Sequence, residues 1–188
     1  MKILFVILSV MYITATQVQG IYSPGKVTKG DSASYYCNES MKLVVSVSNV
    51  HNTDTTDVMY YKDGKIYDDD FLPSHLKNSQ EDLLTIFKEV LTQEEWKKLK
   101  EIKGTYFLLF NITANTSGKP KEIIFKFRKT DPVMMYMSPD RLYELEKRLK
   151  EVMELIPCKD FSLFKNIKYL DAIDYKNIAP FDEKTNNT

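Results

Sequence analysis

Hydrophobic and polar positions alternate along several parts of the chain, and the period of the alternation predicts which elements form. Residues 43–50 are rich in β-branched side chains and alternate with a period of two, which is typical of a half-buried strand. Further on, the runs 58–61 and 65–67 flank Asp63 and Gly64, a dipeptide that readily takes the positive φ angles of a tight turn. We therefore expect a strand and then a small hairpin.

The next segment carries two helix-start signals. Ser79 followed by Asp82 has the spacing of a capping box, and Thr92 followed by Glu95 repeats it. Apolar residues then recur at helical spacing and give each predicted helix one inward face: Leu83, Phe87, Val90 and Leu91 in the first, Trp96 and Leu99 in the second. The sequence thus predicts a bent pair of helices.

After the helix pair the period returns to two. Residues 105–112 alternate with aromatic side chains on both faces, which predicts a central strand. Residues 123–127 alternate with one charged face, and the turn-forming stretch 115–120 lies between the two runs. These runs predict a second hairpin.

A long amphipathic helix is predicted next. Ser138 and Pro139 supply an N-cap and a first-turn proline, and Pro157 is expected to end the helix. Its apolar stripe consists of Leu142, Leu145, Leu149, Val152 and Ile156. Its charged residues indicate a solvent-exposed face with ion pairs within the helix: Glu144, Glu146, Lys147, Arg148, Lys150, Glu151 and Glu154. A last short strand is predicted at 167–170. Together the elements predict an α+β fold in which helices pack on a small mixed or antiparallel sheet.

The first 20 residues have the layout of a secretory signal peptide. A short basic start precedes the apolar run from Ile3 to Ile13, and a polar stretch follows. A membrane span needs about 20 apolar residues, so we expect no membrane anchor. Cleavage after Gly20 would export the protein to the periplasm or the cell surface.

The remaining chain suits one domain. Residues 21–40 are polar and turn-rich, which favours an irregular lead-in. Residues 41–181 are expected to form a single α+β domain, whose core is preceded by an extra N-terminal strand and hairpin, and residues 182–188 are expected to be a disordered tail.

Two cysteines, Cys37 and Cys158, follow the predicted cleavage point. In an oxidising compartment they are a candidate disulfide that links the start and the end of the domain. A loop of this length would contribute roughly 4 to 5 kcal/mol in the chain-entropy model. Two buried free thiols are the alternative.

Composition removes several function classes. The chain has 26 basic and 26 acidic residues, so no nucleic-acid partner is expected. It has only six glycines and no phosphate-cradling loop, so no nucleotide or other cofactor is expected. His51 and His75 lie in no metal-ligand spacing and are interpreted as surface residues.

The densest acidic run is the one weak metal candidate. Calcium prefers flexible loops rich in oxygen ligands, and the run supplies Asp68, Asp69 and Asp70. The EF-hand spacing is absent, so a solvated acidic loop is the plainer interpretation.

One segment resembles a known fold. It contains Gly-Thr-Tyr-Phe-Leu-Leu-Phe at 104–110, a Ser-Gly-Lys turn at 117–119, Ile-Ile-Phe-Lys-Phe at 123–127 and then the amphipathic helix. This pattern resembles the βαββαβ core of TonB C-terminal-like domains. The whole chain, including 48–53 and 142–150, is more similar to an uncharacterised secreted family of Bacteroides. The resemblance implies fold and export but no activity, and the transducer role of TonB is not transferred.

Two hypotheses on function follow. The first is a non-enzymatic exported binding or interaction protein, whose partner is a protein or peptide paired with an open sheet edge. The alternative is a hydrolase of extracytoplasmic glycan or peptide, whose carboxylate site would draw on the acidic run together with Glu94, Glu95 or Glu101. An enzyme should show a pocket with converging, pKa-perturbed carboxylates, and a binding module an open edge or flat patch. We expect the binding module.

Overall fold

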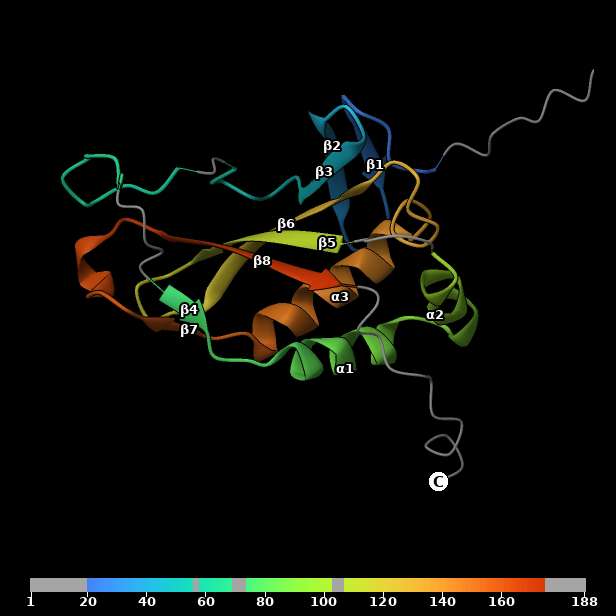
Figure 1. The fold of residues 1–188 in the computed structure, drawn as a ribbon. Coiled ribbons are helices and arrows are strands. Elements are labelled where there is room, and N and C mark those ends of the chain that lie inside the picture. Colours follow the sequence, from blue (N-terminus) through green and yellow to red (C-terminus); the bar gives the residue numbers. More distant parts are fainter. Residues whose placement is uncertain (1–19, 56–57, 69–73, 103–106, 175–188) are drawn as a thin grey trace, which may run out of the picture.

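The structure, a computed structural model, describes residues 20–55, 58–68, 74–102 and 107–174. Within these ranges the chain forms three α-helices, a six-stranded sheet and a separate two-stranded ladder (Figure 1). Every neighbouring pair of strands in the sheet is antiparallel. The expected α+β fold class is confirmed.

The main sheet brings the two halves of the chain together. Its strands, in spatial order, are β1 (Lys26–Lys29), β2 (Ser34–Met41), β3 (Val44–Asn49), β6 (Pro120–Arg128), β5 (Phe107–Ala114) and β8 (Ile167–Asp174). The small ladder pairs β4 (Ser74–Leu76) with β7 (Leu155–Pro157). Strands β1 and β8 are therefore the two edges of the sheet.

The expectation of an irregular lead-in at 21–40 is wrong, because β1 and most of β2 lie there. In β2 the side chains of Tyr35 and Cys37 are fully buried, while Tyr36 and Asn38 point to the opposite side and are exposed. This alternation has the period of a strand. Only two buried residues carry it, however, and their neighbours are polar, so the sequence alone does not predict a strand here. The domain therefore includes these strands.

Both predicted capping boxes are present. Helix α1 (Gln80–Val90) begins after Ser79, whose hydroxyl accepts a hydrogen bond from the Asp82 amide, and α2 (Gln93–Lys100) begins after Thr92 in the same way. In each case the third helical residue returns a carboxylate to the cap amide. Local side-chain chemistry thus fixes both helix starts.

Helix α3 (Pro139–Val152) begins at the predicted proline but ends before the predicted Pro157. Leu155 instead enters β7, where it is buried and its amide donates to the Gly118 carbonyl at 2.9 Å. A Cβ on Gly118 would lie 2.2 Å from the Leu155 carbonyl oxygen, so this contact needs glycine. Pairing with β4 and with this turn therefore replaces the last helical turn.

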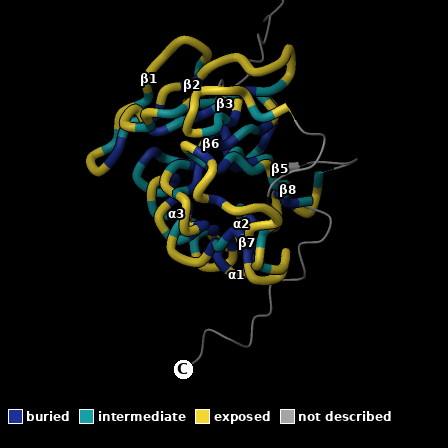
Figure 2. Tube along the Cα trace, turned by 90° about the vertical axis from the view of Figure 1, so that its left-hand side faces the viewer, coloured by how far each residue is buried: buried dark blue, intermediate teal, exposed yellow. Residues whose placement is uncertain are grey.

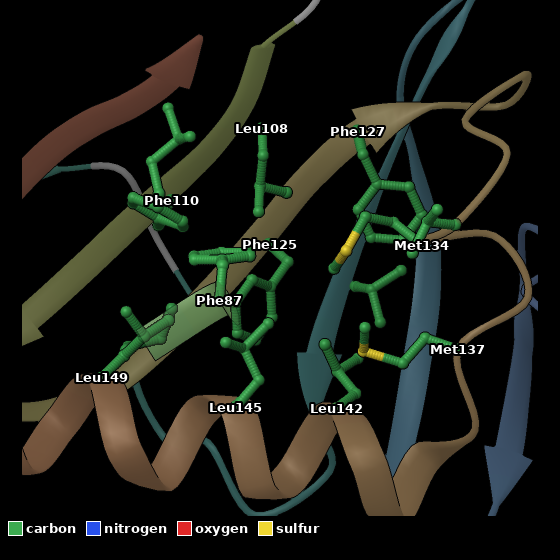
Figure 3. Close-up of a cluster of buried hydrophobic side chains, with 14 of the residues drawn as sticks. Phe87, Leu108, Phe110, Phe125, Phe127, Met134, Met137, Leu142, Leu145 and Leu149 are labelled. Atoms are coloured by element: carbon green, nitrogen blue, oxygen red, sulfur yellow. The ribbon is translucent and has the colours of Figure 1, made fainter. Parts of the chain in front are cut away.

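One face of the main sheet carries the core. Side chains of α3 point toward the strands and meet aromatic residues of β5 and β6, and Phe87 of α1 joins them (Figure 3). The buried positions gather between the sheet and the helices, whereas the outer surfaces of the helices are exposed (Figure 2). The opposite face of the sheet has no helix against it in the described residues (Figure 1).

The predicted hairpin at 58–67 is reduced to a single bridge. Tyr60 pairs with Ile66, and Gly64 takes a φ of 87° at the turn. Beside it, Phe164 stacks on Tyr61 at a centroid distance of 4.9 Å and meets the edge of Tyr67 at 5.4 Å. These ring contacts attach the hairpin to the segment that leads into β8.

Candidate functional site

Strand β8 is the longer of the two edges of the main sheet. It pairs with β5 over eight consecutive positions without a register shift. Strand β1, at the other edge, has four residues and begins and ends with lysine, two features that discourage further pairing. In the part of the chain that the structure describes, β8 has no strand on its outer side.

Alternate residues of β8 direct their backbone groups outward. The amide of Ala172 donates to its neighbour, Asp171 Oδ1, at 2.7 Å, and its carbonyl accepts from Gln80 Nε2 at 3.0 Å, so both groups point away from β5. In an antiparallel ladder without a bulge the backbone groups two and four residues away point the same way. The outward amides and carbonyls of Lys168 and Leu170 therefore form the open part of the edge.

The helix-free face of the sheet leads to this edge. One row of paired residues crosses all six strands: Val27, Tyr36, Ser48, Ile124, Asn111 and Leu170. The two ends of the row are the most exposed, with Val27 at 47%, Tyr36 at 40% and Leu170 at 52%. A partner on β8 would therefore contact an apolar side chain as well as main-chain groups.

A buried polar network lies on the other face, between β2 and α3. The Tyr35 hydroxyl donates to Glu146 Oε2 at 2.5 Å, and Lys150 forms an ion pair with Oε1 of the same carboxylate. Burial, and then the Glu146 charge, raise the pKa of Tyr35, so the phenol stays protonated. The predicted ion pair within the helix is thus present between Glu146 and Lys150. Glu146, however, is fully buried and does not lie on the solvent-exposed face of α3.

A pocket of about 310 Å³ opens beside this network. It lies where β3 ends, β6 begins and α3 passes. Its polar lining comes from Ser32, Asn49, His51, Asn52, Lys121, Glu122, Tyr143 and Lys150. The sequence analysis interpreted His51 as a surface residue and did not predict this pocket, because its lining comes from segments that are far apart along the chain.

Two of the carboxylates proposed for a hydrolase, Glu94 and Glu95, are engaged in ion pairs. Glu95 forms a bidentate ion pair with Arg141, at 2.6 and 2.7 Å, and the Arg141 hydrogen bond lowers its pKa to about 2. Glu94 pairs with Lys98 one turn away, and Glu101 is the C-cap of α2. The Arg141 guanidinium also donates to the Val90 carbonyl, so this pair joins α1, α2 and α3.

Among the described residues, the pocket linings do not gather carboxylates. Three surface hollows lined by described residues contain one each: Asp54, Glu95 and Glu122. The one described carboxyl group with a raised pKa is Asp171, where burial is the main cause, and it caps its neighbour's amide. Retaining and inverting glycosidases need two carboxylates about 5 to 10 Å apart across the substrate.

The calcium candidates are only partly described. Asp68 is exposed, and Asp69 and Asp70 lie outside the described residues. Across the described ranges, no group of three or more His, Cys, Asp or Glu side chains is placed to hold a metal ion.

The two cysteines are free and differ in environment. Cys37 is fully buried in β2, and burial raises the pKa of its thiol to about 11. Cys158 is exposed just after β7, and its Sγ lies 3.5 Å from Nδ1 of His75 in β4. The proposed disulfide between them is thus absent, because one thiol lies inside the main sheet and the other on the small ladder.

This difference predicts selective thiol chemistry. In the native protein a disulfide reagent should modify Cys158 and leave Cys37 untouched, because the thiolate is the reactive form and burial suppresses it. Thiol titration should count one reactive thiol in buffer and two in denaturant. A Cys158→Ser variant should show no reactive thiol in buffer. Failure to find either thiol in denaturant would show that a bridge forms after all.

The predicted cleavage point lies at the start of the described residues. The amide of Ile21 donates to the Met135 carbonyl at 2.8 Å, and the hydroxyl of Tyr22 donates to the Met137 carbonyl at 2.9 Å. The chain is therefore tied to the domain directly after Gly20. No helix among the described residues combines the length and the apolar character that a membrane crossing requires.

Comparison with known proteins gives a fold neighbour. The chain is similar to the crystal structure of a DUF5043 family protein from Bacteroides uniformis ATCC 8492, with a TM-score of 0.69 and 18% sequence identity. The alignment covers 87% of this chain and 92% of that chain. No protein-family model and no curated protein matches the sequence. At this identity the likeness shows a shared fold, that of a Bacteroides domain of unknown function.

Proposed function

We propose that this protein is an exported, non-enzymatic binding protein that takes an extended segment of another protein along β8. The observation that carries the proposal is the outward row of backbone groups at Lys168 and Leu170, at the long edge of the sheet. An extended segment satisfies such groups by adding one more antiparallel or parallel strand.

The contrast between the two edges supports β8 as the binding edge. Natural sheets protect their edges with short strands, charges or bulges, and β1 has the first two of these devices. Strand β8 is twice as long, is regular and exposes Leu170. Asp171 and Gln80 cover only the backbone of Ala172. The remaining part is Ile167–Leu170, whose one lysine has its ammonium group bonded to Asp54 and Thr113 and mostly buried. This part is therefore the segment expected to pair.

The arrangement of carboxylates favours binding over hydrolysis. The acidic residues of α2 stabilise its N-terminus and its contact with α3, and the described lining residues of each of the three pockets include a single carboxylate. Hydrolysis by a carboxylate pair needs an acid and a base whose pKa values are pushed apart in one site. The hydrolase therefore remains the second candidate.

Export, and the resemblance to a TonB C-terminal-like core, are part of the same proposal. The signal-like first 20 residues and the anchoring of the chain directly after Gly20 support cleavage at that point. The order β5, β6, α3, β8 supports a TonB C-terminal-like core, to which β1 to β3 are added on the β6 side.

A peptide selection tests the binding function. Random short peptides displayed on phage are selected against the folded protein, and the affinity of each selected peptide is measured by fluorescence anisotropy. Leu170→Pro removes the outward amide without touching the β5 ladder and should weaken binding by about tenfold or more. Leu170→Ala keeps the amide and serves as the matched control, with a smaller loss.

Circular dichroism and thermal unfolding establish that both variants fold. Peptides that bind wild type and Leu170→Pro with equal affinity would contradict the proposal, and so would a selection that yields no binding peptide. Release of product from glycan or peptide substrates, abolished by replacement of a pocket carboxylate, would favour the hydrolase.

A further inference from the structure

We propose that the pocket between α3 and the end of β3 is a second binding site, which takes a small carboxylate-bearing molecule. This site is separate from the β8 edge and does not depend on the proposed peptide binding. Its cavity of about 310 Å³ is at the lower end of the range for small-molecule sites. A ring-sized molecule with one acidic group fits that volume.

The acceptors of the pocket are already occupied. Glu122 receives three hydrogen bonds, from the Thr53 amide at 2.8 Å, the Thr53 hydroxyl at 2.9 Å and the Asp54 amide at 3.0 Å. Asn49 Oδ1 accepts the amide of His51 at 3.0 Å. Glu146, the ion-pair partner of the lining residue Lys150, is fully buried and also accepts a hydrogen bond from Tyr35. Among the described lining residues a ligand would therefore find no free carboxylate, and the acceptors left open, the Asn52 amide oxygen and the Ser32 hydroxyl, are uncharged.

The donors, in contrast, are available. Among the described residues, Lys121 Nζ, the Tyr143 hydroxyl and the His51 ring make no hydrogen bond or ion pair. Lys150 uses part of its three-donor ammonium group on Glu146 and keeps the rest. Because the charged donors are open and the carboxylates are engaged, the ligand that complements the pocket is an anionic acceptor.

The charges select a monoanion. Lys121 and Lys150 bring two positive charges, and Glu122 and Glu146 bring two negative ones, so the pocket has no large excess of positive charge. A doubly charged phosphate would meet uncompensated repulsion from the carboxylates, whereas one carboxylate is matched by the exposed ammonium of Lys121. The exposed ring of Tyr143 offers an apolar surface for the body of the ligand.

Histidine signals provide the readout, since the chain has two histidines, His51 in the pocket and His75 on β4. Glucuronate and glucose are titrated separately into the full mature protein at constant pH and ionic strength, and the imidazole carbon–proton resonances are followed by NMR. Glucuronate should shift the His51 resonance in a saturable manner and leave His75 unchanged. Glucose should shift neither.

Two variants locate the site. Lys121→Gln should weaken glucuronate binding by about tenfold, because it removes a charged hydrogen bond to the ligand. Lys97→Gln replaces an exposed lysine on α2 and should leave the affinity unchanged. Equal shifts with glucose and glucuronate would overturn the carboxylate assignment. No saturable shift of His51, or equal binding by Lys121→Gln, would overturn the site.

Discussion

Phe125→Ala should lower the free energy of unfolding by about 3 to 5 kcal/mol, the largest single effect that the structure predicts. Phe125 is fully buried on β6 between β3 and β5, and its ring meets the edge of Phe110 at a centroid distance of 6.3 Å. Leu145 of α3 points toward it from the other side of the core (Figure 3). The surrounding elements cannot close the cavity without moving the sheet and the helix.

Urea unfolding followed by circular dichroism measures this loss. Phe125→Leu is the matched control and should cost considerably less, because it keeps most of the buried apolar volume. The replacement of Val27, an exposed residue at 47%, by alanine should change stability by less than about 0.5 kcal/mol. A loss below about 1 kcal/mol for Phe125→Ala would show that β6 does not pack as described.

Tyr35→Phe should destabilise the protein by about 1 to 3 kcal/mol, although it removes only one oxygen atom. That oxygen donates to the fully buried Glu146 carboxylate at 2.5 Å. Without the donor the carboxylate keeps its burial and loses a hydrogen bond, and an incompletely paired buried charge is costly.

Tyr36→Phe is the matched control for this substitution. Tyr36 is the next residue in β2, but its side chain lies on the helix-free face and is 40% exposed. Removal of its hydroxyl group should change the free energy of unfolding by less than about 0.5 kcal/mol. If both variants unfold at the same urea concentration as wild type, the Tyr35–Glu146 bond does not contribute to stability.

The elements that sequence reasoning predicted best are those with local chemical signals. The capping boxes at Ser79 and Thr92 and the proline after Ser138 fix helix starts through contacts within a few residues. The period of two in 123–127 likewise predicted β6. Such signals need no knowledge of the rest of the chain.

The elements that it missed depend on distant partners. Strand β7 forms because Leu155 pairs with Leu76 of β4 and with the Gly118 turn, contacts that override the helical stripe. Glu146 has the sequence context of an exposed helix face, yet it is buried because Tyr35 offers it a partner. Neither pairing has a local signature.

The candidate sites are likewise assembled by the fold. The open edge could be expected only in general terms, since the order of strands that places β8 at the edge is not readable from 167–170 alone. The pocket joins Lys121 of β6 with Tyr143 of α3 and His51 after β3. Each is an ordinary surface residue in sequence.

Amide hydrogen exchange along β8 tests the central claim, that this edge is open and binds an extended segment. In the free protein the amides of Lys168 and Leu170 should exchange quickly, and those of Tyr169 and Asp171, which face β5, slowly. Addition of a selected peptide should slow Lys168 and Leu170 and leave the other two unchanged. Slow exchange of Lys168 and Leu170 before the peptide is added, or unchanged fast exchange after saturation, would contradict the claim.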